Sequence, residues 1–144
     1  MKWYIKVLKN YANFKDRARC REYWMFILIN TIIFIVLGIL FMLPNMIYSE
    51  FMLQSYNDYD YVEIINTINT IYLILYIIYS VYGLFILIPS LAVSVRRLHD
   101  IGKSGWYILL YLVPFVGNII LMFWFSEEGM PETNKYGENP KLVE

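Results

Sequence analysis

The sequence predicts an all-α membrane protein with three transmembrane helices, because three long apolar runs carry no charged side chain. Residues 23–43, 71–95 and 106–125 contain no Asp, Glu, Lys, Arg or His. Each run has the ~20 residues that a helix needs to cross a hydrocarbon core ~30 Å thick. A helix pairs its backbone N–H and C=O groups within one segment, so such runs fold as helices in lipid. The composition agrees: 59% of the residues are hydrophobic, against about 45–50% in soluble domains.

The remaining segments are short, so we expect residues 1–144 to form a single membrane domain without a soluble catalytic domain. The first apolar run begins after residue 22 and is longer than the apolar part of a signal peptide, which argues against a cleaved leader. One cysteine, Cys20, excludes an internal disulfide.

The distribution of Lys and Arg predicts the orientation. The segment before the first run carries seven, the connection 44–70 none, the connection 96–105 three, and the tail after residue 125 two. Because short cytoplasmic segments are enriched in Lys and Arg, this alternation places the N-terminus in the cytoplasm. With three spans, the C-terminus is then predicted to lie outside.

Residues 2–14 precede the first span and repeat at helical period. Trp3, Tyr4 and Val7 fall on one side, and Lys2 and Lys6 fall on the other. This pattern predicts an amphipathic helix that lies in the membrane interface. An ordinary helix packed on the cytoplasmic ends of the spans fits the same pattern. At the other end of the chain, the tail 126–144 is rich in Gly, Pro, Asn and Glu, so we expect it to be extended or disordered.

Prolines and glycines predict irregularities in the later spans. The second helix should begin early, near Ile64, and Pro89 should kink it near its cytoplasmic end. Pro114 and Gly117 lie inside the third run, which is therefore expected to be bent or closely packed there.

The stretch RRLHDIGKSGW, residues 96–106, contains the only histidine of the chain, His99. A neighbouring carboxylate, Asp100, could orient it for proton transfer. The interpretation we favour is that these polar groups tie the connection to the arginine-rich N-terminal segment and to lipid phosphates. Cys20 and His99 supply only two soft ligands, which is too few for a zinc site. The sequence therefore predicts no catalytic residue, metal or cofactor.

Acidic and basic side chains are absent from all three apolar runs. Proton-coupled transporters, pumps and voltage sensors place such groups within the membrane. Three helices also lack the internal repeats that support alternating access. A transport path would have to be assembled from several copies of the chain.

Three segments resemble a known family in their order and spacing. They are WYIKVLKNYANFKDRARCREYW near the start, IPSLAVSVRRLHDIGKSGWY in the middle and EGMPETNKYGENP in the tail. Together they are similar to the small bacterial inner-membrane proteins grouped as domain of unknown function 805. The resemblance implies a multi-pass protein of the cytoplasmic membrane, and it implies no activity.

We expect a non-enzymatic membrane module whose arginine-rich segment and RRLHD turn form a basic collar on the cytoplasmic face. The collar would bind anionic lipid headgroups, a second copy of the chain or another membrane protein, and no nucleic acid. The alternative is a small enzyme, or an oligomeric transporter or pore, that acts on a lipid-like or phosphorylated substrate through the RRLHD turn. The candidate binding residues are Arg17, Arg19, Arg21, Glu22, Trp24, Arg96, Arg97, His99, Asp100 and Trp106.

Overall fold

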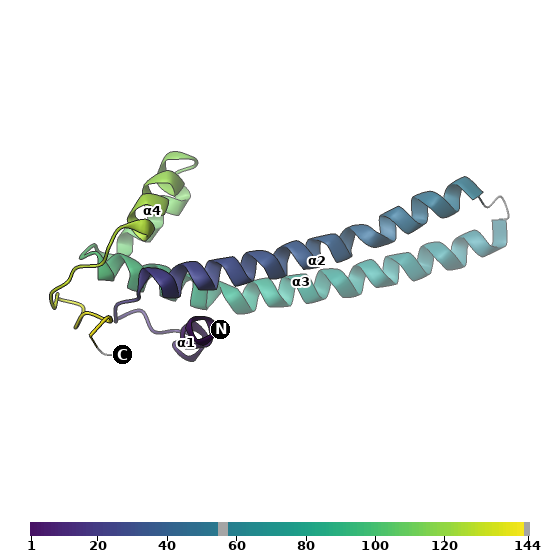
Figure 1. Cartoon of the computed structure of the whole chain (residues 1–144). Coiled ribbons are helices and arrows are strands. Elements are labelled where there is room, and N and C mark those ends of the chain that lie inside the picture. Colours follow the sequence, from purple (N-terminus) through teal and green to yellow (C-terminus); the bar gives the residue numbers. More distant parts are fainter. Residues whose placement is uncertain (55–57, 143–144) are drawn as a thin grey trace. The chain divides into compact units, whose positions relative to one another are not determined.

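The computed structural model describes residues 1–54 and 58–142, and it is helical throughout these ranges apart from its loops and tail (Figure 1). This confirms the predicted all-α class. Within the described residues, the only pairing of the β type is an isolated bridge between Asn134 and Gly137. The elements are, in order, α1 (Lys2–Lys9), α2 (Cys20–Gln54), α3 (Asp58–Asp100), the 3₁₀ helix η1 (Gly105–Leu112) and α4 (Val116–Ser126).

The chain divides into two compact units. One unit combines both ends of the chain, Met1–Ile29 and Ile86–Glu144, and the other is the middle segment Asn30–Phe85. The first unit contains nearly every charged side chain that the sequence singled out. The second consists of the adjoining parts of α2 and α3.

Aromatic rings join α2 to α3 within the middle unit. Phe34 lies 5.4 Å from the ring of Tyr79 and 5.3 Å from that of Tyr82, measured between centroids. The hydroxyl of Tyr82 also donates a hydrogen bond to Asn30 Oδ1 over 2.6 Å. The aliphatic side chains between these contacts are largely exposed, for example Ile32 at 52%. An apolar surface of this kind suits a lipid environment.

Two helices are long and apolar enough to cross a membrane within the described residues: Cys20–Met46 and Glu63–Asp100. They contain the first two predicted spans, 23–43 and 71–95. The connection predicted between them is mostly helical, because α2 continues through Pro44 to Gln54 and α3 begins at Asp58. In the first turns of α3, the hydroxyls of Thr67 and Thr70 donate to the carbonyls four residues earlier, over 2.9 and 2.8 Å. These bonds satisfy polar side chains within the helix.

The prediction of one continuous helix over residues 106–125 is wrong. The run is divided into η1 and α4 by a break at Val113–Phe115. Pro114 has no N–H to donate, and the residue before a proline is driven toward extended backbone. Val113 accordingly has φ −93° and ψ 103°, and Phe115 has φ 61°. The chain therefore turns in the middle of the apolar run.

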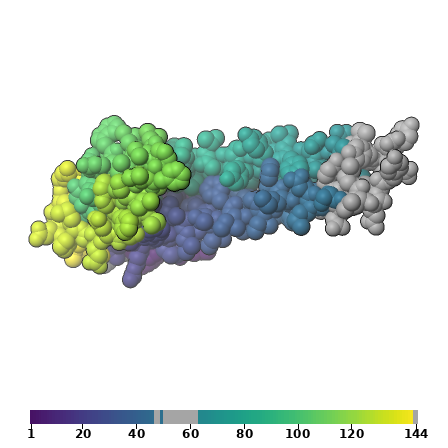
Figure 2. Space-filling view, turned by 90° about the horizontal axis from the view of Figure 1, so that it is seen from above, coloured from purple at the N-terminus to yellow at the C-terminus, as the bar shows by residue number. Residues whose placement is uncertain are grey.

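η1 and α4 pack against each other as a short hairpin, residues 105–126. A Cβ added to Gly117 would lie 1.9 Å from the carbonyl oxygen of Leu110, so only glycine permits this approach. At the base of the hairpin, the rings of Tyr107 and Trp124 are 5.3 Å apart, which places the two ends of the run together. The hairpin forms an outer face of its unit in the space-filling view, and Phe115 at its tip is 83% exposed (Figure 2).

Candidate functional site

Three polar segments of the first unit assemble into one body, which we call the cap: residues 1–22, 96–105 and 126–142. At its centre is Asp100, the last residue of α3. Its carboxylate accepts a hydrogen bond from Arg17 Nε over 3.0 Å and pairs with Arg97 Nη1. All three side chains are buried. A buried carboxylate between two guanidinium groups requires this pairing, because an unpaired charge in the interior is strongly destabilising.

Arg17 joins the centre of the cap to the C-terminal tail. Its Nη1 donates to the carbonyl oxygens of Glu132, over 2.8 Å, and Gly137, over 3.2 Å, and its Nη2 donates to that of Met130. The tail also donates one hydrogen bond to the centre of the cap, from Met130 N to the Asp100 carbonyl oxygen over 2.9 Å. The guanidinium of an arginine presents five N–H donors in a fixed plane, whereas the ammonium of a lysine has only three on one atom.

Two further arginines bind backbone carbonyls near the tail. Arg97 Nε donates to the Phe125 carbonyl over 3.1 Å, and its Nη2 donates to that of Glu127. These carbonyls belong to the end of α4, where helical acceptors have no intrahelical partner. Arg19 Nε donates to the Pro140 carbonyl over 2.9 Å. The arginines of the N-terminal segment and of the RRLHD turn thus fix the position of the tail.

Glu22 and Arg96 form a second buried ion pair. Arg96 Nη1 lies 2.9 Å from Glu22 Oε1, and Lys6 Nζ lies 3.5 Å from the other carboxylate oxygen. Two more donors of Arg96, Nε and Nη2, are buried without a hydrogen-bond partner. The backbone also connects these segments, since Ala18 N donates to the Arg96 carbonyl over 3.0 Å.

Helix α1 lies against this region through its apolar side. Val7 is buried, and the ring of Tyr4 stacks on that of Phe26 at 5.3 Å. The helix is shorter than the predicted range 2–14, because it ends at Lys9. Asn10 follows in a non-helical conformation, and its side chain donates to the Lys6 carbonyl over 2.9 Å. The interfacial position of this helix stays a prediction.

His99 is held by the tail and not by its neighbour Asp100. Its ring stacks on Tyr136 with the centroids 3.6 Å apart and the planes 3° from parallel. Its Nδ1 lies 3.3 Å from the Asp16 carbonyl, and its own carbonyl accepts from Asn134 over 2.9 Å. His99 follows the apolar run 71–95, and burial lowers its pKa below the ordinary value. The arrangement stabilises a neutral, stacked imidazole.

The remaining candidate residues are at the surface of the first unit. Arg21 is exposed, Trp24 is 38% exposed and Trp106 is 79% exposed. Arg19 is half-buried. The structure therefore separates the predicted collar into buried arginines, which are engaged inside the chain, and an exposed rim.

The predicted tail is corrected by these contacts. Residues 130–140 are not free, because their carbonyls accept hydrogen bonds from Arg17 and Arg19. The tail is therefore docked on the N-terminal segment and is not disordered. The side of the membrane on which the C-terminus lies stays a prediction. Sequence reasoning also missed Tyr136 and Asn134, and the only signal for them was the family-like pattern of the tail.

The described residues contain no group of three or more His, Cys, Asp or Glu side chains arranged to hold a metal ion. Residues 11–138 match the family described as "Protein of unknown function (DUF805)". The chain belongs to this family. Among its relatives, "Inner membrane protein YhaH" of Escherichia coli (strain K12) is 40% identical over 142 residues, which cover 99% of this chain and 98% of that protein. "Inner membrane protein YhaI" of the same strain is 36% identical with the same coverage. No solved structure matches the chain.

Proposed function

We propose that this DUF805 member is a non-enzymatic module of the bacterial inner membrane that crosses it twice and binds anionic lipid on the cytoplasmic side. One observation carries the topology. Hydrogen bonds join the tail to the N-terminal segment, which supports placing the segments 1–22, 96–105 and 126–142 on one side, and these contain all 12 Lys and Arg residues. The connection 44–70 contains none. The positive-inside rule is satisfied more completely by two spans than by three.

In this topology the hairpin enters one leaflet only. Its eight residues of 3₁₀ helix and 11 residues of α-helix each extend about 16 Å, roughly half of the ~30 Å hydrocarbon core. Irregular backbone is costly in lipid. At the tip this cost is reduced, because Val113, Val116 and Gly117 donate to nearby carbonyls and Pro114 has no N–H.

We assign the binding of anionic lipid to cations on the exposed surface of the cap. Arg17, Arg96 and Arg97 are at most 6% exposed, so lipid phosphates do not reach them. Lys2, Lys9 and Lys15 are exposed. Each cation close to an anionic leaflet contributes about 1 kcal/mol of attraction.

The alternative, chemistry at the RRLHD turn, has less support. A general base must reach a substrate proton, and it usually needs a group that orients it. His99 is stacked on Tyr136, while both oxygens of Asp100 are engaged by arginines. We therefore interpret the turn as the joint that holds the cap together.

The test is retention of phosphatidylglycerol by the purified full-length protein, measured by native mass spectrometry. We expect the triple variant Lys2→Gln, Lys9→Gln, Lys15→Gln to retain about tenfold less of this lipid, and added salt to weaken retention by the wild type. The matched control replaces the same three residues with Arg, which keeps the charge. Unchanged retention in the Gln variant, or an equal loss in the Arg variant, would contradict anionic-lipid binding by these residues.

A further inference from the structure

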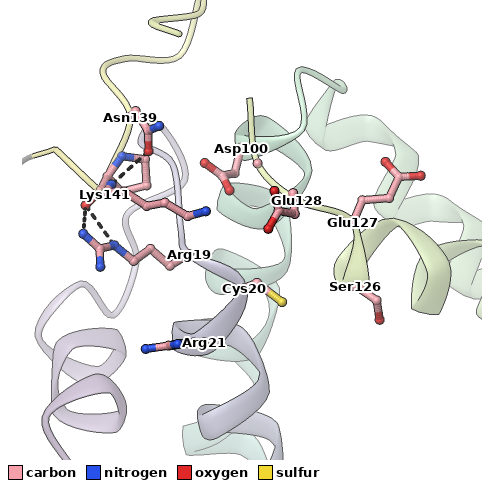
Figure 3. A pocket seen from close by; sticks show the side chains of 11 residues that line it. Arg19, Cys20, Arg21, Asp100, Ser126, Glu127, Glu128, Asn139 and Lys141 are labelled. Carbon is pink, nitrogen blue, oxygen red and sulfur yellow. Dashed lines mark hydrogen bonds between the residues drawn. The ribbon is translucent and has the colours of Figure 1, made fainter. Parts of the chain in front are cut away.

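The cap contains a cavity of about 500 Å³ beside the start of α2. Its lining comes from three segments that are distant in sequence: residues 19–21, the end of α4 and the stretch after it at 126–129, and the tail at 139–141. Asp100 lies between the tail and the two glutamates (Figure 3). The hydrogen bonds and ion pairs that hold the cap together do not depend on this cavity. A cavity of this size with charged walls is a candidate ligand site.

The charges around the cavity fall into two groups. Asp100 and Arg19 are engaged in the cap, with arginines and with the Pro140 carbonyl respectively. Arg21, Lys141 and Glu128 form no hydrogen bond or ion pair through their side chains anywhere in the described ranges 1–54 and 58–142. Figure 3 shows the Lys141 ammonium and the Glu128 carboxylate extending from opposite sides toward the same open space. The adjacent Glu127 turns outward in the same view.

Two tryptophans indicate the depth of this cavity in the membrane, and this step rests on the proposed topology. Trp24 follows Arg21 by three residues on α2, and Trp124 precedes Glu127 by three residues at the end of α4. Three residues of helix correspond to about 4.5 Å. Tryptophan is enriched at the level of the headgroups, and Lys103 Nζ lies 4.3 Å above the Trp124 ring, as suits a wet interface. Both sides of the cavity are thus at headgroup depth.

We propose that the cavity binds the phosphoethanolamine headgroup of phosphatidylethanolamine. This headgroup combines a phosphate anion with a primary ammonium. Arg21 and Lys141 supply cations for the phosphate, and Glu128 supplies an acceptor for the three N–H donors of the ammonium. An anionic headgroup without an amine would leave Glu128 facing a like charge, which is unfavourable. A choline headgroup has no N–H to donate, so it would fill the space without the hydrogen bonds.

The experiment exposes the delipidated full-length protein to an equal mixture of phosphatidylethanolamine, phosphatidylglycerol and phosphatidylcholine with identical acyl chains. Native mass spectrometry then counts the retained lipids. We expect at least tenfold preference for the ethanolamine lipid over the choline lipid, equivalent to about 1.4 kcal/mol. Glu128→Gln should remove this preference and leave phosphatidylglycerol retention equal or higher. The double variant Arg21→Gln, Lys141→Gln should lower retention of the ethanolamine lipid.

The matched control is Glu127→Gln, which removes the same charge from the outward-facing neighbour and should keep the preference. Hydrogen exchange of the tail verifies that each variant retains the folded cap. Equal retention of the ethanolamine and choline lipids by the wild type, or the same effect from Glu127→Gln as from Glu128→Gln, overturns the proposal. So does binding of soluble O-phosphoethanolamine as tight as that of the lipid, which would identify a free aminophosphate. The triple variant Lys2→Gln, Lys9→Gln, Lys15→Gln tests anionic-lipid binding separately, so the two proposals can fail independently.

Discussion

Replacing Arg17 with Gln should release the C-terminal tail from the cap. The Arg17 side chain is 1% exposed, and it donates to the carbonyls of Met130, Glu132 and Gly137 in addition to its pair with Asp100. Hydrogen bonds from a charged donor contribute about 1.5–3 kcal/mol each. Three such bonds at the lower limit give roughly 4–5 kcal/mol for docking of the tail, with the usual non-additivity of neighbouring contacts.

Hydrogen exchange followed by mass spectrometry measures the release of the tail directly. The amide of Met130 donates to the Asp100 carbonyl, and that of Gly137 donates to Asn134, so both should be protected in the wild type. A loss of 4 kcal/mol corresponds to about a thousandfold lower protection wherever exchange proceeds by release of the tail. Arg17→Lys keeps one charge near Asp100 but lacks the fork, so its protection should be intermediate.

The control for this prediction is Glu138→Gln, which changes an exposed charge within the same tail peptide. Its exchange should match that of the wild type. If Arg17→Gln leaves the protection of the tail unchanged, the arginine does not hold the tail and the reasoning is refuted. If Arg17→Lys matches the wild type, charge alone is sufficient and the fork geometry is not required.

Two further predictions concern the hairpin and His99. Gly117→Ala forces a Cβ against the Leu110 carbonyl, so it should lower the free energy of unfolding by about 1–3 kcal/mol in a thermal melt. The control Gly38→Ala, where a Cβ would meet nothing within 4 Å, should be neutral or stabilising by up to ~1 kcal/mol. Equal effects of the two substitutions would contradict the close packing at Gly117. Because burial lowers the pKa of His99, the folded cap favours neutral imidazole, so protection of the tail should be complete above about pH 6.5 and decrease as the pH falls below it. His99→Gln should remove this dependence, and a pH profile identical in both proteins would exclude His99 as its source.

The sequence predicted the helical class and the first two spans because run length and the absence of charge nearly determine a helix in lipid. It did not predict how far these helices extend beyond the apolar runs. Pro44 lies inside α2, because a helix can continue when a proline removes only one backbone hydrogen bond. In α3, the hydroxyls of Thr67 and Thr70 donate to carbonyls of the same helix. Neither effect changes hydropathy, so the pattern could not show them.

The third run is not the continuous helix that its hydropathy predicted, and the reason was visible but underestimated. Pro114 and Gly117 indicated a bend, and in the structure the same two residues permit a complete reversal. Hydropathy cannot distinguish one crossing of about 20 residues from two half-crossings. The position of the tail depends on that distinction.

The cap illustrates a second limit of sequence reasoning. The arginines and their acidic partners were recognisable from charge and spacing, but most of their acceptors are backbone carbonyls. Those that Arg17 and Arg19 bind in the tail are more than 100 residues away. A carbonyl has no signature in the sequence. Burial then changes the role of these arginines, from free cations to groups that fix the position of the tail.

The side of the membrane on which the tail lies tests the central claim most directly. In a Cys20→Ser background, single cysteines at Lys2, Ser49 and Thr133 can be treated with a membrane-impermeant maleimide in intact spheroplasts and again after lysis. Two spans with a cytoplasmic cap predict labelling at Ser49 in intact spheroplasts, and labelling at Lys2 and Thr133 only after lysis. Labelling of Thr133 in intact spheroplasts, with Lys2 protected, would restore the third span and contradict the account.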